Sequence, residues 1–136
     1  MATAPPPLGS VPFEKSMLIK FGNSTLEVEL NGGKAAAQLA AALPLELSMA
    51  RWGDEYYGAL PVPIASSEKR RDVYEIGEVA LWPPGNAFCI FFGPTPASEG
   101  DEPRMASPGI PLGRVVSGVA MLHSLGARLD VTLKAR

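Results

Sequence analysis

Trp82-Pro-Pro-Gly-Asn-Ala-Phe-Cys-Ile-Phe-Phe-Gly-Pro-Thr-Pro96 is the stretch of this sequence that decides the fold. Its first two prolines end a strand expected over residues 78–82, because proline lacks the N–H that a strand ladder needs. Residues 87–92 are then apolar at every position. In a small β protein such a run predicts a wall strand that is covered on both faces. The next two prolines begin a long loop, which we expect to cover residues 93–109.

Short strand-like runs lie on both sides of this stretch, and several of them alternate apolar and polar side chains. A Gly-Asn-Ser turn joins the first two runs, which predicts a hairpin. About eight short strands without repeats predict an all-β barrel or sandwich. The expected strands cover residues 16–22, 25–30, 45–50, 54–60, 78–82, 87–92, 112–116 and 127–134.

Two short helices interrupt the strands. Asn31 is the expected N-cap of an alanine-rich helix over residues 35–43, and Pro44 ends this helix. Residues 118–125 have the length of a second, two-turn helix with Gly126 at its C-terminal cap. Two lone helices in a β protein suit the open ends of a barrel, so we expect a closed β-barrel with a helix across each mouth.

Charge and composition restrict the class of protein. The chain has 136 residues and a net charge of −2, which fits one globular domain. We expect residues 16–136 to form this domain and the proline-rich residues 1–15 to be a disordered tail. The basic cluster Lys69-Arg70-Arg71 stands among acids, so it predicts a solvated loop over residues 66–72 and no nucleic-acid partner.

Cysteine usage and hydropathy indicate the compartment. A single cysteine, Cys89, excludes an internal disulfide and fits a reducing environment. No run of about 18 apolar residues occurs, so we expect no membrane span. The first residues lack the basic and apolar regions of a signal peptide. A cytoplasmic protein with no membrane partner is therefore expected.

Two motifs carry a family resemblance. Glu75-Ile-Gly-Glu-Val-Ala-Leu-Trp-Pro-Pro-Gly-Asn-Ala-Phe-Cys-Ile-Phe-Phe-Gly-Pro-Thr-Pro96 resembles the signature of a family of small prokaryotic cyclophilin-like proteins of unassigned function. Arg51-Trp-Gly-Asp-Glu-Tyr-Tyr57 resembles the Trp-Gly-Glu segment of the same family, and the likeness covers residues 16–134. It implies a closed cyclophilin-like β-barrel of about eight strands. Gly113-Arg-Val-Val-Ser-Gly118 is also similar to the Gly-Lys-Val element of cyclophilins at large.

The sequence departs from the prolyl isomerases among the cyclophilins. Their substrate-polarising arginine belongs to an Arg-Ile-Ile-Pro-like stretch, where this chain has Tyr56-Tyr-Gly-Ala-Leu-Pro61. Their pocket glutamine and histidine correspond to residues 85–87 and to Gly109. Without a placed donor, a pocket can bind a peptide but should lower the amide rotation barrier poorly. Arg51 and Arg104 are the arginines that could act from another direction.

The candidate site residues are mainly aromatic, since aromatic side chains near turns offer flat apolar walls with polar tips. We expect no catalytic residue, no metal site and no cofactor. His123 has no metal-ligand neighbour in the sequence, and Cys89 should be an un-ionised thiol. Asp54, Glu55 and Glu75 are weak general acid or base candidates, because solvated turn acids are more usual. The expected ligand-binding residues are Trp52, Glu55, Tyr57, Trp82, Phe92 and Met105.

Three function classes follow. The first is a binding module that takes a small molecule or short peptide at the barrel mouth, in a pocket rimmed by Trp52, Tyr57 and the 93–109 loop. The second is a divergent or weak peptidyl-prolyl isomerase, which would be the activity if the protein is an enzyme. The third is a component of a larger enzyme assembly, which rests on fold analogy with the allophanate hydrolase and 5-oxoprolinase relatives.

Overall fold

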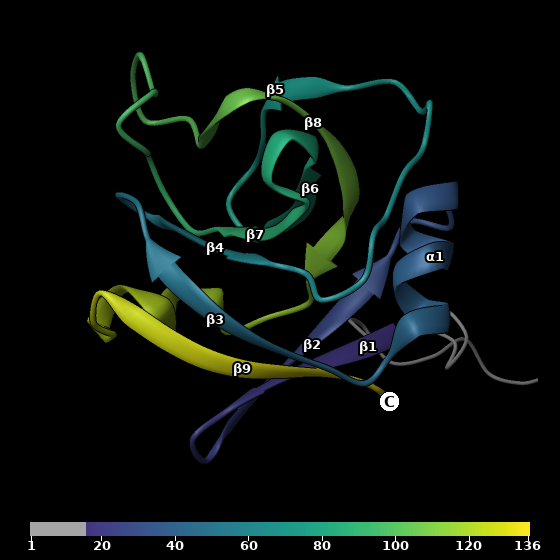
Figure 1. Cartoon of the computed structure of the whole chain (residues 1–136). Coiled ribbons are helices and arrows are strands. Elements are labelled where there is room, and N and C mark those ends of the chain that lie inside the picture. The colour runs from purple at the N-terminus through teal and green to yellow at the C-terminus, as the bar shows by residue number, and fades with distance from the viewer. Residues whose placement is uncertain (1–15) are drawn as a thin grey trace, which may run out of the picture.

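Eight antiparallel strands close into a barrel, and a ninth strand adds to its outside (Figure 1). The computed structural model describes residues 16–136, so the tail predicted over residues 1–15 lies outside the described residues. The elements are β1 (Ser16–Phe21), β2 (Ser24–Leu30), α1 (Lys34–Ala42), β3 (Leu45–Arg51), β4 (Glu55–Ala59), β5 (Arg71–Val73), β6 (Glu78–Trp82), the 3-10 helix η2 (Pro83–Gly85), β7 (Ala87–Phe91), β8 (Arg104–Val115), the 3-10 helix η3 (Val119–Ser124) and β9 (Arg128–Ala135).

The ring of the barrel runs β2-β1-β9-β3-β4-β7-β6-β8 and closes where β8 pairs with β2. At the closure Val115 lies opposite Val28 and Gly113 opposite Leu30. A Cβ atom on Gly113 would lie 2.0 Å from the backbone oxygen of Glu29, so this crossing requires a residue without a side chain. β5 pairs only with β8, outside the ring. The prediction of a closed all-β barrel is confirmed.

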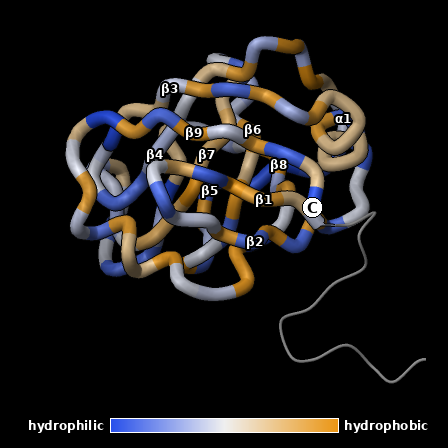
Figure 2. The backbone as a smooth tube through the Cα atoms, turned by 90° about the horizontal axis from the view of Figure 1, so that it is seen from below, coloured by the Kyte–Doolittle hydropathy of each residue, from blue (hydrophilic) through white to orange (hydrophobic). Residues whose placement is uncertain are grey.

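The barrel interior is filled by every second residue of the strands. Figure 2 shows the alternation as repeated changes between orange and blue along the tube. Since successive strand side chains point to opposite faces, one set reaches the interior and the other points outward. We call the inward set the interior cluster; it includes Met17, Ile19, Val28, Leu47, Met49, Tyr56, Val79, Leu81, Phe88, Ile90, Leu112 and Leu133.

Strand β7 is buried on both of its faces, as its unbroken apolar run predicts. Phe88 and Ile90 belong to the interior cluster. Cys89 and Phe91 point the other way and belong to a second, smaller group on the outside of the barrel. We call this group the outer cluster; it consists of Tyr74, Ala80, Ala87, Cys89, Phe91 and Met105, with Trp82 packed against it.

Both predicted helices are present, and each adds buried residues to the interior cluster. Ala35, Ala36 and Leu39 of α1 are buried there, as is Leu122 of η3. The second helix is a 3-10 helix and is shorter than the expected 118–125. Among the helices of the described residues, none is long and apolar enough to cross a membrane.

The cap of α1 differs from the expected one. The N-cap residue is Gly33, not Asn31, and Asn31 instead accepts a hydrogen bond from the Gly33 N–H. The Ala35 N–H at the start of the helix donates to Glu68 Oε1 at 2.7 Å. This hydrogen bond is the main cause of the lowered pKa of Glu68. A distant segment therefore supplies the helix cap, which local sequence signals cannot reveal.

Replacing Glu68 by alanine is expected to lower the free energy of unfolding by about 1 kcal/mol, because the helix loses its acceptor at the N-terminal turn. Urea denaturation followed by circular dichroism measures the change. Lys69→Ala is the matched control, since Lys69 is exposed in the same segment and should leave stability within about 0.5 kcal/mol. Equal effects of both substitutions would contradict the role of Glu68.

The loop expected over residues 93–109 is shorter than predicted, because β8 already begins at Arg104. The prolines of this region misled the prediction. The pairing of β8 with β5 is irregular between Arg104 and Gly109, and Pro108 lies within that irregular part. Pro111 lies beside a second register shift, against β6. Prolines are tolerated at such positions, because the strand does not need every ladder hydrogen bond there. The expected 66–72 loop likewise ends early, where β5 begins.

Candidate functional site

A pocket of about 270 Å³ opens on the outer wall of the barrel. Strand alternation places it there: on β4, Glu55 and Tyr57 flank Tyr56, which points into the interior cluster. Cys89 on β7 lies directly opposite Tyr57 and faces the same way. We call this cavity the outer pocket; its lining residues are Trp52, Glu55, Tyr57, Trp82, Cys89, Met105 and Ala106. The expectation of a pocket at the barrel mouth is corrected, because these residues point away from the interior.

Trp52 reaches the pocket through a tight turn between β3 and β4. Gly53 in this turn has a φ of +63°, a left-handed conformation that favours glycine. A Cβ atom there would also lie 2.8 Å from Pro96 Cδ. The Asp54 N–H donates to the Pro94 carbonyl oxygen at 2.9 Å. The turn is therefore fixed against the loop that follows β7, and this contact holds Trp52 at the edge of the outer pocket.

Trp82 forms a second wall and is fixed by a side-chain hydrogen bond. Its indole N–H donates to Ser107 Oγ at 2.9 Å, which links the end of β6 to β8. Gly85 lies close to the indole ring, and a Cβ atom there would be 3.0 Å from it. Met105 is buried in the outer cluster, against which Trp82 packs, whereas Tyr57 is 39% exposed and lies at the rim. The walls are therefore aromatic and thioether groups on a rigid strand scaffold.

Glu55 is the acid of this pocket, and it is buried. The residue is 3% exposed, and its Oε1 atom has no hydrogen-bond partner within the described part of the chain. Burial raises the pKa of Glu55 to about 7, and the smaller, opposing effect comes from the Cys89 thiol beside it. A carboxyl group in this position changes its charge near neutral pH, because its ionised form is poorly solvated.

Cys89 and Tyr74 are the other titratable groups in this region, and both resist ionisation. Burial raises the pKa of the Cys89 thiol well above its ordinary value, with a further contribution from Glu55. Burial also raises the pKa of Tyr74, whose hydroxyl donates to the Arg71 carbonyl oxygen at 2.9 Å. Both groups are therefore neutral at physiological pH, as the sequence predicts for Cys89.

Neither arginine that could replace the isomerase arginine lines the outer pocket. The guanidinium of Arg51 donates to three backbone carbonyl oxygens and to the Asp54 carboxylate at 2.9 Å. It also lies over the ring of Phe92, 5.0 Å from the ring centroid. These contacts occupy the guanidinium at the start of the β3–β4 turn.

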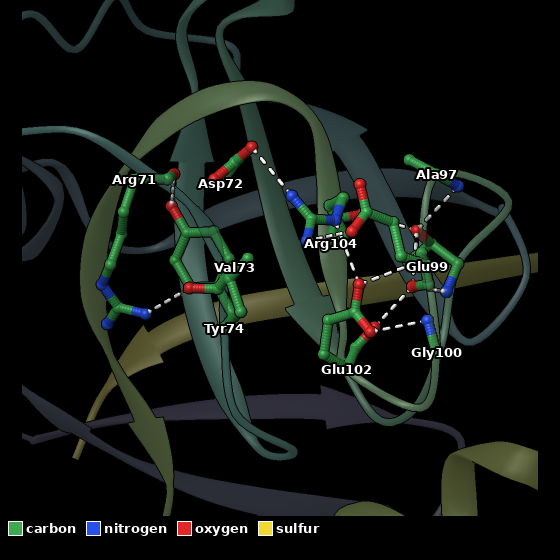
Figure 3. Close-up of polar contacts among 11 residues, drawn as sticks. Arg71, Asp72, Val73, Tyr74, Ala97, Glu99, Gly100, Glu102 and Arg104 are labelled. Carbon is green, nitrogen blue, oxygen red and sulfur yellow. Dashed lines mark hydrogen bonds and ion pairs between the residues drawn. The ribbon is translucent and has the colours of Figure 1, made fainter.

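Arg104 is occupied in a similar way, by acids (Figure 3). Its guanidinium pairs with Glu102 at 3.0 Å, with Asp72 at 3.2 Å and with Glu99 at 3.7 Å. Backbone N–H groups, that of Glu99 first, lower the pKa of Glu102 to about 2, and Arg104 adds to the effect. This cluster fixes the loop before β8 to β5, which is a structural role.

Five of the six residues predicted to bind a ligand lie together around the outer pocket: Trp52, Glu55, Tyr57, Trp82 and Met105. Phe92 does not join them. It is 1% exposed and packs in the interior cluster, where its ring stacks on Tyr56 and makes a T-shaped contact with the His123 ring. Whether the five residues bind a ligand stays a prediction.

The prediction missed two lining residues, Cys89 and Ala106. The alternation along β7 could have assigned Cys89 to the outer face, but a buried thiol in an apolar strand gives no signal of a site. Ala106 carries no chemistry and is exposed on β8. Within residues 16–136, no group of three or more histidine, cysteine or acidic residues could hold a metal ion.

Comparison with known proteins agrees with the fold. The sequence profile of the Cyclophilin-like family matches residues 15–134. Among solved structures, the chain is similar to the hypothetical protein AF2241 from Archaeoglobus fulgidus, whose structure was determined in solution, with 34% sequence identity and a TM-score of 0.76. The superposition covers 94% of this chain and 99% of the archaeal chain. No curated protein matches the sequence.

Proposed function

The chain belongs to the Cyclophilin-like family, and from this premise we propose that it is a binding module that holds a small molecule or short peptide in the outer pocket. The observation that carries the proposal is the composition of the lining: aromatic and thioether walls around a single buried acid. Ligand sites are commonly concave and mostly apolar, with a few placed polar groups.

The cavity volume limits the size of the ligand. At about 270 Å³, the outer pocket exceeds the roughly 150 Å³ that accepts benzene in an engineered core. It is slightly smaller than the roughly 300–1,000 Å³ of sites for drug-sized molecules. One ring with a short substituent, or one side chain of a peptide, fits this volume.

Intrinsic fluorescence tests the proposal directly. The chain has two tryptophans, and both line the outer pocket, so their emission should change when 2-phenylethanol or a phenylalanine-containing tripeptide binds. Ala106→Phe should abolish the response, because a phenyl group on this exposed lining position fills the cavity. Ala41→Phe is the matched control on the exposed face of α1. A response that persists unchanged in Ala106→Phe would reject the outer pocket as the binding site.

Isomerase activity is expected to be absent. Arg51 and Arg104 are held by other groups, and the pocket lining contains no cationic residue, so no guanidinium is placed to polarise a substrate amide. At micromolar protein, the cis/trans exchange rate of a Xaa-Pro peptide, followed by NMR, should equal the uncatalysed rate. Measurable acceleration would favour the divergent isomerase instead.

A further inference from the structure

One carboxyl oxygen of Glu55, a residue that lines the outer pocket, has no hydrogen-bond partner in the described residues, and this requires an explanation. Glu55 is 3% exposed, and its Oε1 atom has no hydrogen-bond partner within residues 16–136. A buried polar group without a partner costs on the order of 1–3 kcal/mol, and a buried charge costs more. A methionine would fill a similar volume without this cost. The stability of the fold therefore does not account for a carboxyl group at this position.

The surroundings of Glu55 offer it no cation. The lining residues include no lysine, arginine or histidine, and the neighbouring arginines are held by Asp54 and by the acids around Arg104. Trp52, Tyr57 and Trp82 supply aromatic rings, whose faces attract cations. An acid among aromatic rings is a combination suited to a positively charged group.

We propose that the outer pocket selects a ligand with a protonated amine on a small aromatic or apolar body, and that the Glu55 carboxylate pairs with this amine. The inference rests on the proposed function, because it assigns the ligand class of the same pocket. The apolar body lies between the tryptophans and Met105, and the ammonium group completes the hydrogen bonding of Glu55. A charge-assisted hydrogen bond of this kind is worth roughly twice a neutral one.

The titratable groups facing Glu55 determine the pH dependence. Cys89 faces it from β7 and Tyr57 from its own strand, whereas β6 and β8 contribute Trp82, Met105 and Ala106, which do not titrate. Since burial raises the pKa of Glu55 to about 7, the empty pocket is largely neutral below that pH. Affinity for an amine should therefore rise as pH increases through about 7. It should fall again near pH 10, where an aliphatic amine loses its own proton.

The experiment compares three probes that share one ring: 2-phenylethylamine, 2-phenylethanol and phenylacetate. At pH 8 the amine should bind at least about ten-fold tighter than the alcohol, and phenylacetate should bind weakest. Glu55→Gln should reduce the affinity for the amine to that for the alcohol and leave the alcohol unchanged. It should also remove the pH dependence. Glu75→Gln is the matched control, because Glu75 is an exposed acid outside the lining.

The outcomes separate this inference from the proposed function. If the amine and the alcohol bind equally and Glu55→Gln changes neither, the inference fails while the binding module stands. Preference for phenylacetate would also overturn it. If no probe binds at millimolar concentration, both proposals fail. A second readout is calorimetry below pH 7, where binding of the amine should release a proton from Glu55, and no release would contradict the pairing.

Discussion

Phe88→Ala is expected to lower the free energy of unfolding by about 3–5 kcal/mol, because it removes a large side chain from a closed interior. Phe88 is 0% exposed and lies in the interior cluster between β4 and β6, opposite Gly58 and Leu81. A barrel of paired strands cannot collapse into the cavity without breaking ladder hydrogen bonds. Urea denaturation with an unchanged m value measures the loss.

Phe91→Ala is the informative comparison, since Phe91 is equally buried but belongs to the outer cluster. Its ring stacks on Tyr74 with centroids 4.7 Å apart. A comparable loss of stability is expected, but only Phe91→Ala should also change the response of the tryptophans to a ligand. Tyr57→Ala, at the exposed rim, should cost less than about 1 kcal/mol. A loss below about 1 kcal/mol for Phe88→Ala would contradict the closed interior.

Glu55→Gln is expected to change the pH dependence of stability. The pKa of Glu55 is raised from 4.5 to about 7 in the folded protein, so the folded state binds the proton more tightly than the unfolded state. The stabilisation is fully present below about pH 4.5 and is lost as pH rises through about 7. Linkage converts this pKa difference to on the order of 3 kcal/mol. The Glu55→Gln variant has no titratable group at this position, so its free energy of unfolding should not show this decrease as pH rises.

Denaturation curves of the two proteins between pH 4 and pH 8 test this expectation, and the difference between them isolates Glu55 from the other acids. The free energy of unfolding of the native sequence should fall relative to that of the variant across this window and then level off. Parallel curves would show that Glu55 does not carry a raised pKa. Addition of 2-phenylethylamine should reduce the difference at pH 8, because a bound ammonium group stabilises the ionised carboxylate.

Much of the barrel could be predicted from local patterns. The unbroken apolar run of β7 predicted a strand with two covered faces, and Glu55 and Tyr57 stand two residues apart, which places them on one face of a strand. The convergence of Trp82 and Met105 on that face depends on the order β4-β7-β6-β8. Long-range pairing fixes this order, and no local pattern encodes it.

The wrong predictions also concern features that local sequence patterns do not determine. Phe92 is one residue away from Phe91, and a change of one position moves a side chain to the other face of the wall. The mouth of the barrel was the wrong place for the pocket, because the sequence does not say beside which face of a doubly covered strand a cavity remains. Glu68 caps α1 from more than thirty residues away, and the prolines of β8 hid a strand that tolerates them at its irregular positions.

The two-sided burial of β7 has a consequence for how this protein can change over evolutionary time. On β7, residues 88 and 90 pack in the barrel interior, whereas residue 89 lines the outer pocket. On β4, Tyr56 likewise packs in the interior, and its two neighbours line the outer pocket. Positions that build the barrel interior and positions that line the outer pocket therefore alternate along the same strands and overlap at few places. Substitutions at the outward positions can change the shape and charge of the outer pocket while the barrel interior is inherited intact.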